Sequence, residues 1–285
     1  IPMRTVRGTS TFTNFGVGES TLQKVVPGAA PDGTVNKFGK RSLSVDTLIL
    51  ARSVFPLLET FQTSYDARRE VGEAHGKKIA KFRDESFFIQ AVKSALLGAT
   101  TYAGLDAAAG HFGGTQVTLA AAADAEDPAL LYTALVDLFV GMEQKDVDPM
   151  TDDVLVAVSP AHYAVLEQNE LLIDRNIILS DGNSIQARVL KARGVPVVSS
   201  NNFVGGKTIA GHLLSNVDNA NAYDGDFTKV VACAFSPRAL MAGQTIPLTT
   251  GVFWSDVYKQ WLVDAWLSYA VGPNRPEFAG VVLRP

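Results

Sequence analysis

The sequence predicts an α+β fold in which an extended β-hairpin arm and one long helix accompany a mixed α/β unit. Three observations predict this class. Residues 1–50 alternate like strands around a Gly- and Pro-rich turn, residues 64–97 contain no proline and read as one unbroken helix, and residues 127–241 mix apolar strand runs with helices. At about 1.5 Å per residue the helix would be roughly 50 Å long, longer than a compact domain of this size is wide. We therefore expect copies of the chain to cover one another.

The arm comprises two strand-like runs on either side of the turn at residues 27–33. A lone hairpin is marginally stable in water, so the arm needs a partner surface. Residues 1–50 carry six basic and three acidic side chains in a chain of net charge −4. A positive arm on a negative body favours clasping between subunits, although ordinary surface scatter explains the charges nearly as well. The arm residues expected at this interface are Arg4, Arg7, Lys24, Pro27, Gly28, Lys37, Lys40 and Arg41.

The long helix follows an apolar bridge at residues 51–63, which Pro56 interrupts. Ser64 can cap the helix. One face carries an incomplete apolar stripe and the other is charged, so we expect the helix to lie across a sheet or another subunit. Gly72 and Gly76 thin the stripe and allow a bend, and Arg68 near the helix start is a further interface candidate.

A Gly/Ala-rich connection, residues 99–126, leads to the mixed unit. Asp127 and Pro128 predict the start of a helix that ends at Glu143, and Ser159 and Pro160 predict the start of another that ends near residue 168. Residues 152–158, 184–191, 195–199 and 229–235 read as strands. We therefore predict that residues 127–241 form a mixed α/β unit.

The C-terminal segment contains a long strand-like or mixed run, residues 251–270, and a last strand at residues 280–283. Four aromatic residues in the run fit either a helix or a strand pattern: Trp254, Tyr258, Trp261 and Trp266. Core packing explains them. The alternative is an anchor between subunits, because Trp and Tyr are enriched at the energetic centres of interfaces. Trp254, Tyr258 and Trp261 are the candidates for that anchor.

The motifs of catalysis and of metal binding are missing or incomplete. Residues 205–208 resemble the end of a phosphate loop, but Asn201 stands where that motif requires a glycine. The single cysteine, Cys233, cannot form an intrachain disulfide or a thiolate metal site alone, and Ser159 near His162 is already needed as a helix cap. Neither the four histidines nor the acidic residues at 146–153 have metal-ligand spacing. We predict no catalytic, cofactor-binding or metal-ligating residues, and no enzyme.

Amino-acid composition excludes several further classes of protein. Hydrophobic residues make up 47% of the chain, enough for a proper core. No run of five like charges occurs, which argues against direct gripping of DNA through a basic stripe. No apolar run approaches the ~18 residues of a membrane span, and we expect no signal peptide. Because the chain opens at Ile1, we expect that an N-terminal segment was either cleaved or lies outside this sequence.

The order of these parts resembles tailed-bacteriophage major capsid proteins of the HK97-like fold. The segments that carry the resemblance to the short-tailed (podovirus) branch are the arm tip 26–28 with the apolar residues 48–50, the helix start 65–68, the strand-to-helix step 156–163, the strand 193–198 and the segment 267–285. The resemblance implies that residues 1–50 are the E-loop, that residues 51–126 and 242–285 form the peripheral domain with its spine helix, and that residues 127–241 form the axial domain.

The implied function is self-assembly, through pentamers and hexamers, into an icosahedral shell around phage double-stranded DNA, without sequence-specific binding. The implied partners are other copies of the chain, a scaffolding protein, a portal protein and a decoration protein. The implied location is the virion, with assembly in the host cytoplasm. An encapsulin-like nanocompartment shell shares this architecture and stays an alternative. An α/β enzyme is a third hypothesis, which the missing motifs disfavour.

Overall fold

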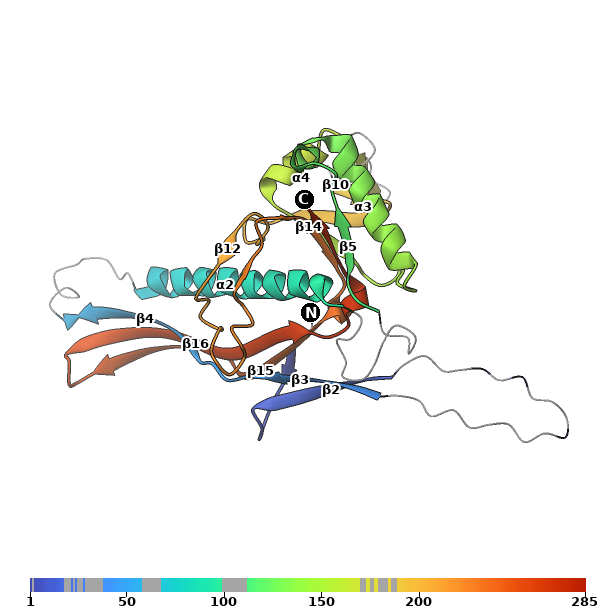
Figure 1. Cartoon of the computed structure of the whole chain (residues 1–285). Helices are drawn as coiled ribbons and strands as arrows, with labels where there is room; N and C mark the ends of the chain where they lie inside the picture. Colours follow the sequence, from blue (N-terminus) through green and yellow to red (C-terminus); the bar gives the residue numbers. More distant parts are fainter. Residues whose placement is uncertain are drawn as a thin grey trace.

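The computed structural model describes residues 1, 3–17, 22, 24, 28, 38–57, 68–98, 112–169, 173–174, 177–178, 184–185 and 189–285. It confirms the mixed helix and sheet class. Figure 1 shows an elongated unit, in which a long helix lies along a narrow sheet, and a second unit built on a larger sheet, with a hairpin arm leaving the base of both.

The narrow sheet has four strands in the order β1 (Met3–Thr5), β15 (Leu240–Ser255), β16 (Gln260–Pro273) and β4 (Ile49–Pro56). The run at residues 251–270, expected to be strand-like or mixed, is strand-like, and it consists of the end of β15, a turn and most of β16. Its turn is Asp256-Val257-Tyr258-Lys259, with Lys259 at a φ of 50°. That turn contains no glycine or proline, the residues that usually indicate a hairpin turn, so this hairpin was not predictable from the sequence. The expected bridge at residues 51–63 is also partly wrong, because β4 continues to Pro56 at the sheet edge, where proline is tolerated.

The predicted long helix is confirmed as α2 (Arg68–Leu96), while residues 64–67 lie outside the described part. The helix runs without interruption through Gly72 and Gly76. One face of its second half is buried, between Ile79 and Ala95, and lies against the inner face of β16, which includes Leu267. The helix therefore lies across a sheet, as the half-apolar pattern predicts.

The larger sheet has seven strands in the order β5 (Thr115–Thr118), β17 (Ala279–Leu283), β14 (Val230–Phe235), β6 (Leu155–Val158), β11 (Val195–Ser199), β10 (Val189–Ala192) and β7 (Ile173–Asp174). The strands β6, β11 and β14 lie within the predicted ones. The stretch 99–126 is more than a connection, because it contains β5 and a 3-10 helix, η3 (Ala122–Glu126). Through β5 and β17 this sheet takes strands from both segments that the resemblance assigns to the peripheral domain.

Two helices cover the larger sheet, and both begin where the sequence predicts. In α3 (Pro128–Glu143) the Asp127 carboxylate accepts hydrogen bonds from the backbone N–H groups of Ala129 and Leu130. In α4 (Pro160–Leu166) the Ser159 hydroxyl oxygen accepts one from the His162 N–H. Cys233 lies fully buried in β14, where burial raises the pKa of its thiol. It is a small residue of the hydrophobic core.

Short elements complete the fold. The arm is the antiparallel pair β2 (Thr11–Val17) and β3 (Phe38–Ser44), which confirms a hairpin in this segment. Most of the predicted turn at residues 27–33 lies outside the described residues. Further two-stranded pairs are β8 (Ile177–Ile178) with β9 (Ser184–Ile185) and β12 (Thr208–Ile209) with β13 (Gly225–Asp226). The 3-10 turns η5 (Pro237–Ala239) and η6 (Pro276–Phe278) join the two sheets.

The segment 200–229, here called the strap, crosses α2 and reaches the narrow sheet (Figure 1). The Tyr223 hydroxyl donates a hydrogen bond to the Val271 carbonyl and accepts one from the Val271 N–H, each 2.8 Å long. The His212 ring stacks between Phe82 and Tyr223, with centroids 4.7 and 5.3 Å away. Lys93 of α2 donates to two strap carbonyls. The strap thus fastens α2 to β16.

Removing the Tyr223 hydroxyl should weaken this fastening. We expect Tyr223→Phe to lower the free energy of unfolding by about 1–3 kcal/mol, because two buried backbone groups lose their partner. Burial raises the pKa of Tyr223 to about 12. Because this pKa is raised in the folded state, Tyr223 contributes fully to the free energy of unfolding below about pH 10, the ordinary pKa of tyrosine. The contribution is lost as the pH rises towards 12.

Denaturant unfolding near pH 8 and near pH 11 measures both effects. The wild type should lose stability between the two conditions, and the variant should lose less. Tyr132→Phe, at a half-buried position in α3, is the control. Equal losses in Tyr223→Phe and in the control would contradict the prediction.

Candidate assembly interface

One face of the narrow sheet is left uncovered by α2. Directly opposed residues of neighbouring strands share a face, so the register identifies this outer face as three rows. The rows are Leu50–Trp266–Thr249, Arg52–Asp264–Gly251 and Val54–Leu262–Phe253.

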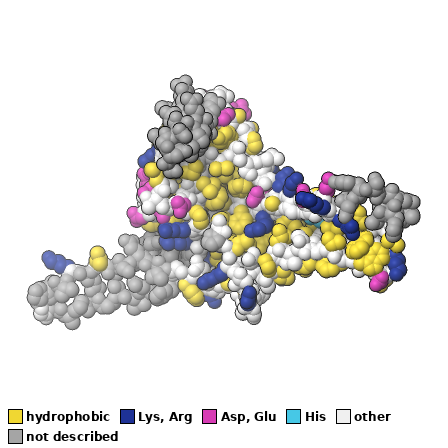
Figure 2. Space-filling model, turned by 180° about the vertical axis from the view of Figure 1, so that it is seen from behind, with side chains coloured by type: hydrophobic (Ala, Val, Ile, Leu, Met, Phe, Trp, Pro, Cys, Tyr) yellow, Lys and Arg dark blue, Asp and Glu magenta, His cyan; other side chains and the backbone are white. Residues whose placement is uncertain are grey.

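The outer face is largely apolar. Leu50, Val54 and Phe253 are 48%, 44% and 47% exposed, and the rings of Phe253 and Trp266 lie 6.2 Å apart. Figure 2 shows hydrophobic side chains spread over the unit that carries these strands. Contiguous apolar surface of this kind marks a protein interaction site.

An ion pair is set into the middle row. The Arg52 guanidinium binds both carboxylate oxygens of Asp264, at 2.8 and 2.6 Å. This bidentate contact raises the pKa of Arg52. The Asp264 carboxylate is buried, and the Phe253 ring lies against the neighbouring Gly251, where a Cβ atom would clash with it. The pair orders the outer face while leaving its flanking rows apolar.

The strand register places the three aromatic candidates for the anchor between subunits in two different environments. Trp254 and Trp261 are cross-strand partners with ring centroids 5.2 Å apart, on the face that α2 covers. The Arg68 guanidinium lies 5.1 Å from the centroid of Trp261, a cation–π contact. Tyr258 lies in the turn and is 74% exposed. The structure thus brings Arg68, Trp254 and Trp261 together at the open end of the helix–sheet layer, and it leaves Tyr258 pointing outwards.

Within the described residues, hydrogen bonds near its base join the arm to the body. Asn14 donates to the side chain of Asn274 over 2.7 Å, and Arg41 donates to the Pro273 carbonyl over 3.1 Å. Phe15, one residue further along β2, is 66% exposed. Figure 1 shows β2 and β3 side by side at the base of both units.

The basic candidates of the arm have different surroundings. Arg41 is half-buried at the base. Arg4, Arg7, Lys24 and Lys40 are exposed, as is Gly28, while Pro27 and Lys37 lie outside the described residues. Sequence reasoning missed the apolar outer face altogether. Its signal is the alternation Leu50, Arg52, Val54, which becomes readable once β4 is recognised as a strand.

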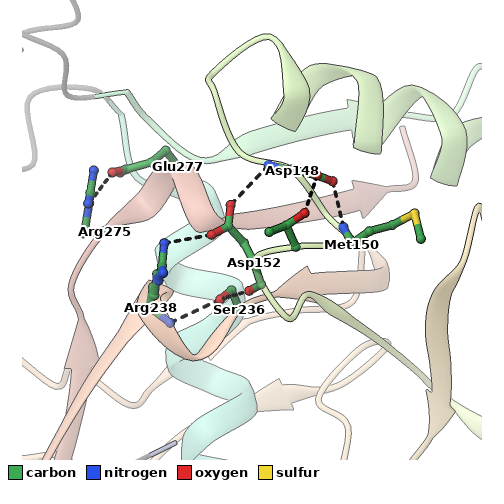
Figure 3. Close-up of polar contacts among 8 residues, drawn as sticks. Asp148, Met150, Asp152, Ser236, Arg238, Arg275 and Glu277 are labelled. Atoms are coloured by element: carbon green, nitrogen blue, oxygen red, sulfur yellow. Dashed lines mark hydrogen bonds and ion pairs between the residues drawn. The ribbon is translucent and has the colours of Figure 1, made fainter.

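The polar clusters have structural roles. Figure 3 shows the group at the junction of the two sheets, where Arg238 binds the Asp152 carboxylate over 2.8 Å and the Ser236 hydroxyl donates to the Asp152 carbonyl. Asp148 accepts from the Thr151 hydroxyl, a contact that lowers the pKa of Asp148. These bonds brace the turns between the sheets.

The same junction contains an ion pair that the sequence did not reveal. The Arg275 guanidinium binds one oxygen of the Glu277 carboxylate over 2.6 Å. Glu277 is only 2% exposed. Because Glu277 belongs to η6, which links β16 to β17, the pair fixes the connection between the two sheets.

The Ser159–His162 pair is a helix cap. The Ser159 hydroxyl lies 2.9 Å from Nδ1 of His162, and Nε2 of the same ring lies 3.1 Å from the Arg284 guanidinium. A catalytic triad would place a carboxylate behind the histidine. Within the described ranges, no three His, Cys, Asp or Glu side chains gather as a metal site, and no helix is long and apolar enough to span a membrane.

Comparisons by sequence found no match to a family model or to a curated protein. Comparisons by structure found clear likenesses. In a capsid structure of the cyanophage P-SCSP1u, the match has a TM-score of 0.81 and 20% identity and covers 99% of this chain and 86% of that chain. In the mature capsid of bacteriophage PhiM1, the match has a TM-score of 0.78 and 23% identity, and it covers 98% of this chain and 83% of that chain. The match to a chain of Mycobacterium phage Che8 has a TM-score of 0.63 and 14% identity, and it covers 96% of this chain and 84% of that chain.

These likenesses extend over nearly the whole chain and over most of each neighbour. At such identities they establish the fold. The chain has the fold of these phage capsid structures, and the HK97-like prediction is confirmed.

Proposed function

We propose that this chain is a major capsid protein of a tailed bacteriophage, and that its copies assemble through pentamers and hexamers into an icosahedral shell around double-stranded DNA. The observation that carries the proposal is a pair of surfaces suited to other copies of the chain: an arm whose described strands are hydrogen-bonded to the body near their base, and an apolar outer face on the narrow sheet. The shared fold supports the same conclusion.

The arm and the outer face of the narrow sheet are able to bind each other in neighbouring copies of the chain. In the proposal, the arm of one copy lies on the outer face of its neighbour. The apolar rows that contain Leu50 and Val54 are then buried and removed from contact with water. Head-to-tail contacts of this kind close into rings. Each contact needs only a standard area of about 800 Å² per partner, because several neighbours hold each subunit at once.

The other units take defined places in this arrangement. We assign residues 127–241 to the axial domain around the five- and six-fold axes, and residues 51–126 and 242–285 to the peripheral domain. In this assignment β5 and β17 are the strands that tie the two domains together. Arg68, Trp254 and Trp261 stiffen the peripheral end, where Tyr258 offers a contact to another copy.

Scaffolding, portal and decoration proteins are the expected further partners. The virion shell is the expected location, after assembly in the host cytoplasm. The short-tailed branch remains a prediction from the sequence motifs. The proposed role is structural, and it requires no cofactor.

Purification of the full chain tests the function directly. We expect megadalton particles on a sizing column and closed shells of pentamers and hexamers by electron microscopy, formed alone or with a co-expressed scaffolding protein. A stable small oligomer under both conditions would contradict the proposal. The contents separate it from the nanocompartment alternative, because a capsid takes up nucleic acid and a nanocompartment takes up an enzyme.

The glycines of α2 give a further prediction. A Cβ at Gly72 or Gly76 would meet no atom within 4 Å, so Gly72→Ala with Gly76→Ala should raise the free energy of unfolding by about 1–2 kcal/mol. If the shell uses bending at these positions, the double variant should also favour one shell size over the other. Thermal unfolding and electron microscopy check the two parts. An unchanged size distribution and unchanged expansion kinetics would remove the bending role.

A further inference from the structure

We propose that Lys77, Lys78 and Lys81, here called the lysine patch, form a surface on α2 that contacts the phosphate backbone of double-stranded DNA. The inference rests on the proposed function, because DNA is what the shell would enclose. It goes further by naming the surface that meets the DNA.

The helix gathers the three lysines on its solvent side. Lys77 and Lys81 are one turn apart, with Cβ atoms about 5–6 Å from each other, and Lys78 lies three residues before Lys81. All three are exposed, and Ile79 on the opposite side is buried. The exposed neighbours Ala74 and Ala80 are small, so a large polyanion can approach the ammonium groups closely.

Ion pairs within the described part of the chain leave the patch open. No ion pair joins any of its three lysines to another described residue. Two acidic residues of the helix are engaged elsewhere: Glu73 with Arg69, and Asp84 with Asn202 of the strap. Like charges one turn apart destabilise a helix, so folding alone does not favour this arrangement.

Charge is also divided between the units. The helix α2 carries seven basic and four acidic side chains, whereas residues 112–169 carry ten acidic and one basic. Figure 2 shows several acidic side chains on the unit with the larger sheet, and side chains of both signs on the elongated unit. A polyanion is therefore drawn to α2 and repelled from the other unit.

The chemistry of the patch fits phosphate better than an acidic protein. Ammonium groups contact phosphates without reading sequence. An amphipathic acidic helix would also need an apolar groove beside the charges, and the exposed neighbours of the patch on α2 are the small residues Ala74 and Ala80 and the acidic residues Glu73 and Asp84. The sequence showed no basic run because the helix, and not the chain order, brings Lys81 beside Lys77.

The test compares two triple variants of the full chain. The patch variant is Lys77→Gln, Lys78→Gln and Lys81→Gln, which keeps helix propensity. The control is Lys207→Gln, Lys229→Gln and Lys259→Gln, which removes the same charge from exposed positions elsewhere. Purified capsomers bind a labelled DNA duplex between about 50 and 200 mM salt. Three phosphate contacts should make the slope of log affinity against log salt less steep by about 2.7 in the patch variant, and leave it unchanged in the control.

Each outcome is decisive. Equal slopes in the two variants would overturn the inference. A patch variant with a wild-type slope but no shells would identify an acidic protein partner instead, and would also overturn it. If the slope changes but the wild type never forms shells, the patch stands and the proposed function fails. If shells form normally and the slope does not change, the proposed function stands without the patch.

Discussion

Removal of residues 22–36 is expected to leave a folded protomer that no longer forms closed shells. The strands that fasten the arm, through Asn14 and Arg41, stay in place. Both sheets and α2 keep their own core. What is lost is the reach of the arm to a neighbour, and with it one of the contacts whose sum holds the shell together.

Sizing chromatography and electron microscopy measure the loss of shells, and circular dichroism with thermal unfolding checks the protomer. We expect the melting temperature of the deletion variant to match that of an unassembled wild-type protomer. Shells of normal size from the deletion variant would show that the arm does not clasp a neighbour.

Placing charge on the outer face should abolish assembly without unfolding the protomer. We choose Leu50→Lys with Val54→Lys, because both side chains are about half exposed on β4, and lysine is a natural residue of edge strands. If a neighbour covers this face, two ammonium groups would be buried unpaired, at a cost of several kcal/mol each. Such a cost exceeds the strength of a modest subunit contact.

The yield of shells at fixed protein concentration measures the effect, and we expect it to fall at least about tenfold for a cost above about 1.4 kcal/mol. The matched control is Leu213→Lys with Val217→Lys, two still more exposed apolar positions on the strap. Its yield should stay near that of the wild type. Equal yields from both double variants would exclude the outer face as an assembly surface.

Elements with a local signal were predictable. Asp127-Pro128 and Ser159-Pro160 fixed the starts of α3 and α4, because capping depends on residues within one turn of the helix. The unbroken helix and the strand at residues 230–235 were equally clear, since their patterns extend over many neighbouring residues. The hairpin arm was predictable from two strand-like runs on either side of a Gly- and Pro-rich segment.

Elements that depend on distant partners were not predictable in the same way. The four-residue strand β5 pairs in parallel with β17, more than 160 residues later. The β15–β16 pair contains two irregularities in register between Gln244 and Thr249, which interrupt the alternation that would have revealed it. Trp261 and Trp266 lie on opposite faces, which follows only once the run is known to be a strand.

The sequence by itself determined the parts of this protein: an arm, a long helix, a mixed unit and the order that joins them. These parts follow from periodicity and capping, which act between residues close along the chain. Only the tertiary structure decided the surfaces. The outer face needs Leu50, Phe253 and Leu262 in one register, and such pairing between remote strands is selected by packing of the whole fold.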